Sequence, residues 1–160
     1  MTADAPAQTH PKNEVIVLTG IPGSGKSTLV RERFPRYKRI NLDTLKTRGR
    51  EASEMLFSLE RLESIIVDNT NTTRRGRKKY IEIAKAYGVM VRSIYLDTPL
   101  AIALKRNALR KGRERVPNGA IARFQRILEP PSLDEGFDSV EVIHALQNIE
   151  EKLDTLSSKN

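Results

Sequence analysis

The 160-residue sequence contains no cysteine and no tryptophan, and aromatic residues make up only 5% of it. Without cysteine, neither a disulfide bond nor a thiolate metal site can form. No stretch of about 18 consecutive apolar residues occurs, so no segment is predicted to span a membrane. Residues 1–13 have neither a basic start nor an apolar core, and they therefore lack the pattern of a secretion signal. We expect a flexible lead to a cytoplasmic protein.

What the chain has in excess is positive charge. Lys and Arg number 28 against 20 Asp and Glu, which gives a formal net charge of +8 and an isoelectric point near 9.9. Such a surplus favours a polyanionic partner such as nucleic acid. A protein that is merely basic would show the same surplus, so the positions of the charges have to distinguish the two. Length and the 38% hydrophobic content predict one globular domain, at residues 14–157.

Strand-like and helix-like segments alternate along the chain. Short apolar, β-branched runs predict strands at residues 14–20, 37–43, 64–71 and 89–97, with a candidate fifth at 139–143. Helical spacing and capping signals predict helices at 26–34, from 51 onward, and at 80–87, 98–109, 117–128 and 146–156. In the helix at 98–109, Thr98 is expected as the N-cap and Pro99 as the first helical residue. The alternation predicts an α/β fold with a mainly parallel sheet of four to five strands.

A glycine-rich loop follows the first predicted strand. Gly20, Gly25, Lys26 and Ser27 have the G-x-x-x-x-G-K-[ST] spacing of a P-loop, in which backbone N–H groups surround a phosphate at a helix N-terminus. Lys26 is expected to reach the β- and γ-phosphate oxygens, and the Ser27 hydroxyl is expected to bind Mg²⁺. The residues predicted to bind ATP or another nucleoside triphosphate in this loop are Gly23, Ser24, Gly25, Lys26, Ser27 and Thr28.

Other classes of P-loop protein fit the sequence less well than a small kinase. A regulatory GTPase would need a guanine-reading N-K-x-D element, which is absent. Also absent is the acidic pair after an apolar strand that is usual in motor and transporter ATPases. A kinase needs an acceptor hydroxyl, a carboxylate that takes its proton, and a cationic lid that neutralises the charge on the phosphoryl group.

Asp43 is the candidate for that carboxylate. It follows the second predicted strand, and the carboxyl ends of parallel strands face the ligand crevice, on the side of the P-loop. A carboxylate about 3 Å from the attacking oxygen would orient the hydroxyl and accept its proton. The alternative is that Asp43 only caps the following helix. Asp68 also follows a strand, and it either assists Mg²⁺ from the outer sphere or forms a turn with Asn69 and Asn71.

The segment 105–115 is the candidate lid, because it carries six basic residues and one acidic residue, Glu114. Arg106 and Arg110 lie four residues apart, so they share one face of a helix and would bind the nucleotide phosphates together. The alternative is a solvated basic surface. A second basic set, residues 74–79, opens a helix, where its charges oppose the positive end of the helix dipole. That local conflict is a weak indication of a partner.

Several segments together resemble the kinase module of 5′-polynucleotide kinases. They are GIPGSGKST (20–28), NLD (41–43), VDNTN (67–71), KRNALRKG (105–112), VP (116–117) and LEPPSLDEGF (128–137). The resemblance covers roughly residues 14–143 and implies that Lys26 and Ser27 are the loop lysine and the Mg²⁺ ligand. It also implies that Asp43 is the general base for a 5′-hydroxyl group, and that Arg110, with Arg106 one turn earlier, contacts the ATP phosphates.

The resemblance is less complete on the side of the acceptor. In some members an arginine three residues after the base holds the 3′-phosphate of the acceptor, and this sequence has Lys46 there. Lysine offers a point charge instead of a two-pronged contact, so Arg48 or Arg50 are alternatives. We expect Lys46, Arg48 and Arg74 to guide the acceptor backbone.

The sequence is therefore interpreted as an ATP- and Mg²⁺-dependent polynucleotide 5′-hydroxyl kinase that acts on DNA or RNA ends. The D-x-D-G-T motif of the 3′-phosphatase domain found in many such enzymes is absent, so a stand-alone kinase is expected. A kinase for a nucleoside, sugar or antibiotic would share the P-loop, base and lid. A nucleotide-binding adaptor would bind RNA without phosphoryl transfer.

Overall fold

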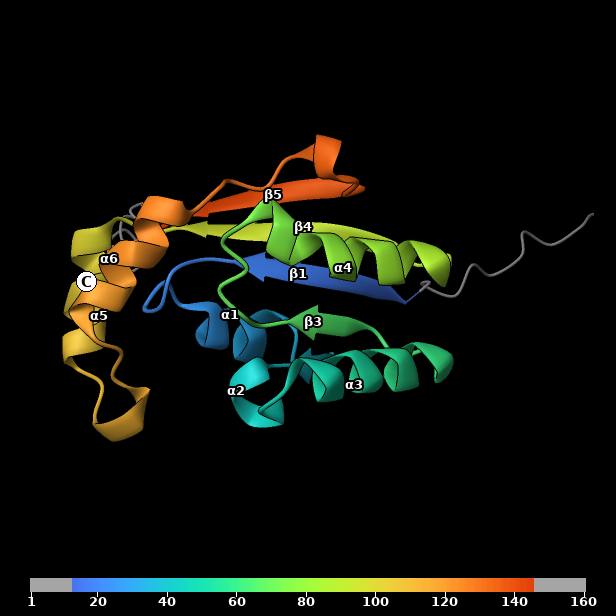
Figure 1. Ribbon diagram of the computed structural model, residues 1–160, viewed down its shortest axis with the longest axis horizontal. Coiled ribbons are helices and arrows are strands. Elements are labelled where there is room, and N and C mark those ends of the chain that lie inside the picture. The colour runs from blue at the N-terminus through green and yellow to red at the C-terminus, as the bar shows by residue number, and fades with distance from the viewer. Residues whose placement is uncertain (1–12, 146–160) are drawn as a thin grey trace, which may run out of the picture.

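The computed structural model describes residues 13–145, and in them five strands form one parallel sheet. The strand order is β2-β3-β1-β4-β5 (Figure 1). The strands are β1 (Glu14–Thr19), β2 (Lys38–Ile40), β3 (Ile65–Val67), β4 (Met90–Asp97) and β5 (Ser139–His144). The predicted α/β fold is confirmed, including the fifth strand. The closing helix expected at 146–156 and nearly all of the expected lead at 1–13 lie outside the described residues.

Helices connect the strands. They are α1 (Lys26–Arg33), α2 (Leu42–Leu45), α3 (Arg48–Glu60), α4 (Arg74–Ala86), α5 (Leu100–Ala108) and α6 (Asn118–Ile127), with single 3₁₀ turns η1 (Gly112–Glu114) and η2 (Leu133–Glu135). Helix α3 begins earlier than predicted, because the Thr47 hydroxyl accepts a hydrogen bond from the Arg50 N–H at 3.2 Å and caps it. None of the helices within 13–145 is long and apolar enough to span a bilayer.

The expectation that Thr98 caps α5 is wrong. Pro99 is the N-cap residue, and the helix begins at Leu100. The Thr98 hydroxyl is buried and donates to the Ser24 carbonyl oxygen of the glycine loop at 3.4 Å. Its bonding capacity is therefore used to hold the P-loop against the start of α5, and not to cap the helix.

The sheet is covered on both faces, as its continuous apolar strands require. On one face, Val30 and Phe34 of α1 pack on residues of β1, β3 and β4, such as Leu18. On the other face, α3 and α4 contribute Met55 and Tyr80 to a larger core. Helices α5 and α6 stand at the end toward which the strands point (Figure 1), and Ile21, Ala103 and Ile121 form a third, small core there.

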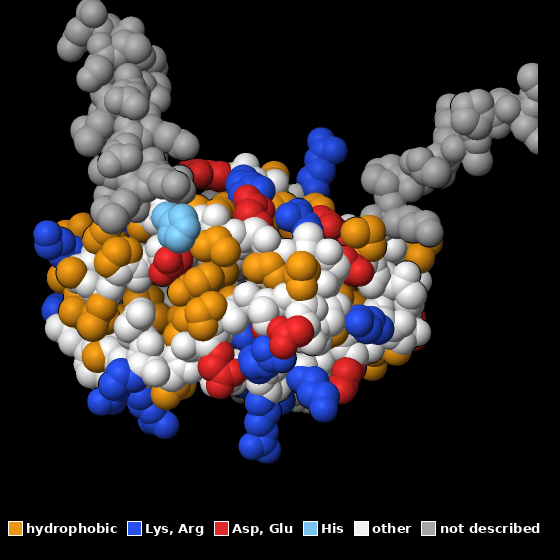
Figure 2. Space-filling model, turned by 90° about the horizontal axis from the view of Figure 1, so that it is seen from above, with side chains coloured by type: hydrophobic (Ala, Val, Ile, Leu, Met, Phe, Trp, Pro, Cys, Tyr) orange, Lys and Arg blue, Asp and Glu red, His pale blue; other side chains and the backbone are white. Residues whose placement is uncertain are grey.

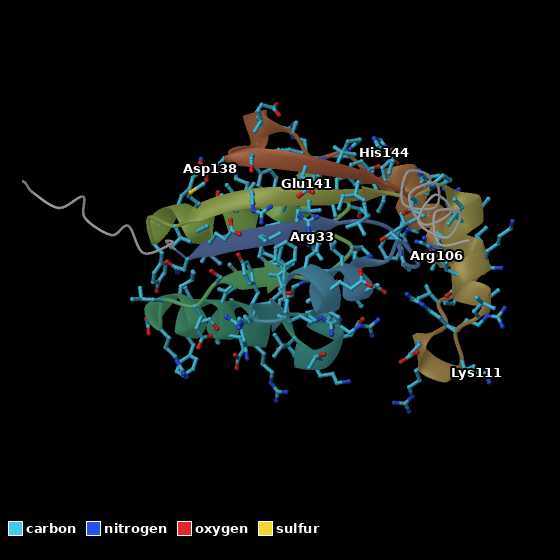
Figure 3. The ribbon with its side chains drawn as sticks, turned by 180° about the vertical axis from the view of Figure 1, so that it is seen from behind. Arg33, Arg106, Lys111, Asp138, Glu141 and His144 are labelled. Atoms are coloured by element: carbon cyan, nitrogen blue, oxygen red, sulfur yellow. The ribbon has the colours of Figure 1, made fainter. Side chains whose placement is uncertain are left out.

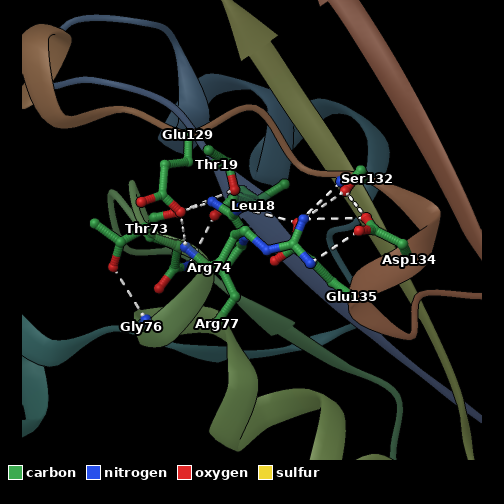
Figure 4. A network of polar contacts seen from close by, with 11 residues as sticks. Leu18, Thr19, Thr73, Arg74, Gly76, Arg77, Glu129, Ser132, Asp134 and Glu135 are labelled. Carbon is green, nitrogen blue, oxygen red and sulfur yellow. Dashed lines mark hydrogen bonds and ion pairs between the residues drawn. The ribbon is translucent and has the colours of Figure 1, made fainter.

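A buried ion pair fixes the loop that follows β3. Arg77 of α4 is fully buried, and its Nε and Nη2 donate to Glu135 of η2 at 2.9 and 3.0 Å (Figure 4). Its Nη1 donates to the Asn71 carbonyl oxygen at 2.8 Å, and the Asn71 side chain donates to the Leu18 carbonyl oxygen at 2.8 Å. The loop after β3 is thus bonded to α4 on one side and to the end of β1, next to the P-loop, on the other.

Candidate active site

The P-loop has glycine where its geometry excludes other residues. Gly23 and Gly25 have φ angles of 85° and 95°, in the left-handed region. A Cβ atom on Gly23 would lie 2.6 Å from the Ala103 carbonyl oxygen, so a side chain there would displace α5. Gly25 occupies the N-cap position of α1, and the next two residues, Lys26 and Ser27, open that helix. The loop therefore has the strand–loop–helix arrangement of a phosphate site.

Lys26 has its ammonium group turned back into the loop. Its Nζ donates to the carbonyl oxygens of Gly20 and Ile21 at 2.7 and 3.0 Å. Although the residue is only half-buried as a whole, burial of the ammonium group lowers its pKa to about 8. The charges of Asp68 and Asp43 oppose this shift, and that of Arg110 adds to it. Within residues 13–145 Lys26 forms no ion pair, so its ammonium group is bonded to neutral oxygens of the loop.

Ser27 and Asp68 form the candidate magnesium site. The Ser27 Oγ lies 3.5 Å from Oδ2 of Asp68, which is buried at the end of β3. The guanidinium of Arg39, from β2, joins both: Nε donates to Asp68 Oδ2 at 2.7 Å, and Nη2 donates to Ser27 Oγ at 3.2 Å. The guanidinium shows that these two oxygens together bind a cationic group. Oxygen ligands are also those that Mg²⁺ prefers.

Within residues 13–145 no group of three or more His, Cys, Asp or Glu side chains could hold a metal ion by itself. Mg²⁺ usually combines one or two protein oxygens with substrate phosphates and water. Ser27 and Asp68 fit that mode of binding. Arg39 was not foreseen from the sequence, since nothing in the local pattern indicates that a residue of a short strand reaches the P-loop.

Asp43 lies just beyond the strand that was expected to end with it. Strand β2 ends at Ile40, and Asp43 belongs to the short helix α2. Asn41 is the N-cap residue of α2, since its Oδ1 accepts from the Thr44 N–H at 3.2 Å, so Asp43 is not the cap. Among the described residues, the exposed Asp43 carboxylate takes part in no hydrogen bond or ion pair, so it is free to contact an acceptor.

A cavity of about 510 Å³ lies beside the P-loop, a size suited to a nucleotide. Its wall combines Gly23 to Gly25 with Thr28 of α1, the ends of β4 and β5, and two arginines of the lid. Arg106 donates through Nη1 to the Gly23 carbonyl oxygen at 3.3 Å, and Arg110 lines the same cavity. Figure 3 shows Arg106 directed toward the loop and Lys111 at the far end of the lid. Part of the basic run therefore faces the cavity.

The candidate acceptor residues lie in two places. Lys46 follows α2 and Arg48 is the first residue of α3, and both are exposed. Lys46 has a φ angle of 70°, which is uncommon for a residue with a side chain. Arg74, at the start of α4, donates through both terminal nitrogens to Asp134, at 3.1 and 3.0 Å (Figure 4). Its contact with an acceptor stays a prediction, and it would have to compete with this ion pair.

Comparisons with known proteins find similar sequences among kinases. A family model described as an AAA domain matches residues 57–131. A bifunctional polynucleotide phosphatase/kinase of Schizosaccharomyces pombe is 33% identical over 135 residues, which are 81% of this chain and 33% of that protein. Over most of its length this chain is therefore similar in sequence to the kinase module of such proteins. A putative bifunctional polynucleotide phosphatase/kinase of Acanthamoeba polyphaga mimivirus is 33% identical over 140 residues, which are 82% of this chain and 33% of that protein.

The chain spans about a third of the length of these two relatives. The resemblance to polynucleotide kinases that the motifs indicated is confirmed over most of the chain. An L-seryl-tRNA(Sec) kinase of Methanococcus maripaludis is 30% identical over 148 residues, 78% of this chain and 56% of that protein. Similarity to kinases therefore extends to more than one type of acceptor.

Solved structures confirm the fold. A gluconokinase from Sinorhizobium meliloti superimposes with a TM-score of 0.62 at 23% identity, covering 89% of this chain and 88% of that chain. Kti12 of Chaetomium thermophilum in complex with ADP-AlF3 gives a TM-score of 0.65 at 17% identity, covering 82% and 89%. At these identities the likeness concerns the fold alone.

Proposed function

We propose that the kinase transfers the γ-phosphoryl group of ATP to the 5′-hydroxyl group of a DNA or RNA end, in a Mg²⁺-dependent reaction. One observation supports the proposal more than any other. Asp43, whose carboxylate has no partner within residues 13–145, follows β2, and the P-loop follows β1, so both lie at the carboxyl edge of the parallel sheet. A base and a phosphate-binding lysine on the same edge of the sheet are the two groups that phosphoryl transfer requires.

In this reaction Asp43 accepts the proton of the attacking hydroxyl group. The hydroxyl oxygen bonds to the γ-phosphorus, and the bond from that phosphorus to the β,γ-bridging oxygen breaks, which leaves ADP. Lys26 and the backbone N–H groups of the loop hold the phosphates, and Arg106 and Arg110 neutralise charge on them from the lid. Ser27 and Asp68 would hold Mg²⁺, whose chemistry is neutralisation of charge on the β- and γ-oxygens.

The acceptor proposed for the kinase is a polymer because the acceptor side is open and basic. Lys46, Arg48 and Arg50 are all exposed next to Asp43 in the chain, and the net charge is +8. The face around β5 instead mixes basic, acidic and apolar side chains (Figure 2). With aromatic residues at only 5%, recognition should depend mainly on phosphates, with little sequence specificity.

The decisive experiment is an acceptor screen with γ-labelled ATP. The wild-type kinase and the Asp43→Ala variant are incubated with matched DNA and RNA oligonucleotides that carry a 5′-hydroxyl or a 5′-phosphate group. Nucleosides, sugars and seryl-tRNA are tested in parallel. We expect transfer only to 5′-hydroxyl ends, and only by the wild type. Preferential labelling of a small molecule or of seryl-tRNA would contradict the proposal and identify the other acceptor class.

A further inference from the structure

A carboxylate outside the reaction chemistry is buried next to the candidate base. Glu51 of α3 is only 1% exposed. Its Oε1 accepts hydrogen bonds from the Tyr80 hydroxyl at 2.7 Å and from the Lys79 ammonium at 2.9 Å. Its Oε2 accepts from Asn69 Nδ2 at 2.8 Å. A buried carboxylate is costly unless it is fully bonded, and an apolar residue would fill the same space at lower cost.

Glu51 is ionised in the folded protein. Burial raises its pKa, but the hydrogen bonds from Tyr80, Lys79 and Asn69 together outweigh burial and leave the pKa below its usual value. An ionised carboxylate can only accept hydrogen bonds. Glu51 therefore fixes which end of the Asn69 amide faces it, because only the Nδ2 end can donate.

The orientation of Asn69 determines what lies at its other end. With Nδ2 on Glu51, the Asn69 Oδ1 faces α2 and accepts from the backbone N–H of Leu42 at 2.9 Å. Leu42 is the first residue of α2 and directly precedes Asp43. A reversed amide would present a donor to the Leu42 N–H, which is itself a donor, and the contact would be lost.

Helix α2 needs such contacts because it has few others. It contains four residues, none of which is fully buried, and only the partly buried Leu45 at its end packs against the core. A second contact comes from Asn41, whose Nδ2 donates to the Asp68 carbonyl oxygen at 2.6 Å. The backbone beside Asp43 is thus held to the residues after β3 by two asparagine side chains, and Glu51 controls one of them.

We propose that Glu51 and Asn69 are positioning residues, which hold the first turn of α2 so that the Asp43 carboxylate lies at the distance from the acceptor hydroxyl that proton transfer requires. This inference rests on the proposed function of Asp43. Neither residue touches the reacting atoms. A displacement of about 1 Å at a catalytic group can lower the rate by about 100-fold, so a lost contact at Leu42 should affect turnover before it affects ATP binding.

The test is an exchange of amide and carboxylate between the two residues. In Glu51→Gln the one amide oxygen is taken by the donors Lys79 and Tyr80, so the NH2 end faces Asn69 Nδ2 and two donors meet. In Asn69→Asp a second carboxylate meets Glu51. The double variant E51Q/N69D restores the pattern: the amide at position 51 donates to one oxygen of the carboxylate at position 69, and the other oxygen accepts from the Leu42 N–H. Asn69→Ala removes the contact altogether.

We expect each single variant to lower kcat by at least 10-fold, with KM for ATP within twofold of the wild type. The double variant should recover most of the lost kcat. Glu14→Gln is the matched control: Glu14 also accepts from a tyrosine and a cation, Tyr37 and Arg92, but it lies at the start of β1, away from the P-loop. Its kcat should stay within twofold. Thermal unfolding is followed for every variant.

Two results would overturn the inference. One is wild-type kcat in folded Glu51→Gln and Asn69→Ala. The other is a loss of kcat in the single variants that the double variant does not recover, although the double variant unfolds at the wild-type temperature. If a single variant fails to fold, a double variant that folds but does not recover kcat also overturns the inference. Wild-type kinase that phosphorylates no 5′-hydroxyl end contradicts the proposed function itself, whereas active wild type with unimpaired variants contradicts only the positioning role.

Discussion

The two sides of the candidate active site are built in opposite ways. On the ATP side the phosphate-binding loop is one continuous stretch, residues 20–28, whose backbone geometry and inward-turned lysine come from a single local pattern. The acceptor side includes a helix of four residues whose start is bonded to the loop after β3 through Asn41 and Asn69, and Asn69 is bonded in turn to Glu51 of α3. Where the backbone itself binds the ligand, local sequence suffices. Where side chains from distant segments hold a short element, the arrangement depends on the whole fold.

The largest expected effect separates these two sides at Asp43. Asp43→Ala should lower turnover by roughly 10²- to 10⁴-fold, because the attacking hydroxyl loses its proton acceptor. ATP binding, which depends on the other side, should stay within a few-fold. Single-turnover transfer to a 5′-hydroxyl oligonucleotide, together with calorimetric titration of ATP, measures both. Turnover within tenfold of the wild type would remove Asp43 from the role of base.

Salt should weaken the acceptor side selectively. If about three phosphates of a single strand are contacted, raising salt from about 50 to about 200 mM should reduce oligonucleotide affinity by roughly 20-fold through counterion release. A fluorescence anisotropy titration of a labelled 5′-hydroxyl oligonucleotide gives the slope. A flat response would be inconsistent with several phosphate contacts and would favour a small acceptor.

Arg39 joins Ser27 to Asp68, and its removal should have a moderate effect on the binding of a divalent cation. Because its guanidinium lies on Ser27 Oγ and Asp68 Oδ2, a divalent cation must compete with it for these oxygens. Arg39→Ala should therefore tighten Mn²⁺ binding several-fold, measured by electron paramagnetic resonance with ADP present. Arg36→Ala removes an exposed charge of the same sign and serves as the control. Unchanged or weaker Mn²⁺ binding in Arg39→Ala would show that Arg39 does not compete.

The smallest expected effect is the uptake of less than one proton by Lys26 when MgATP binds. Its pKa is lowered to about 8 in the nucleotide-free protein, mainly by burial, so at pH 8.5 the amine is largely neutral. Bound triphosphate favours the charged form and raises this pKa, so MgATP binding should take up a proton fraction at pH 8.5 and less at pH 7. Calorimetry in buffers of different ionisation enthalpy measures this uptake. Proton release at pH 8.5 would contradict it.

The sequence predicted the fold and the P-loop because their signals are local. Apolar runs of β-branched residues indicated all five strands, and glycine spacing located the loop between β1 and α1. The boundaries failed where a side chain was bonded elsewhere. Thr98 has the right residue type for a cap, but its hydroxyl bonds to Ser24 across 74 positions of the chain.

The contacts of the candidate site were harder to foresee. The adjacency of Arg39 to Ser27 depends on β3 lying between β2 and β1 in the sheet. The order of the strands cannot be predicted from the local sequence of any one segment. Glu51 appears in the sequence as an ordinary acidic residue of an amphipathic helix. Its burial became visible only when α3 and α4 were packed together on the sheet, with Tyr80 and Lys79 against it.

The contacts of Gly23 with α5 limit how the candidate lid can move. Its backbone lies against Ala103 near the start of α5, and Arg106 holds its carbonyl oxygen one turn later. A rigid swing of the whole helix would break both contacts and open the P-loop. Nucleotide is therefore expected to enter and leave by motion of the segment beyond Leu109. Changes in that segment should alter the rate of nucleotide exchange, while α5 stays bound to the P-loop.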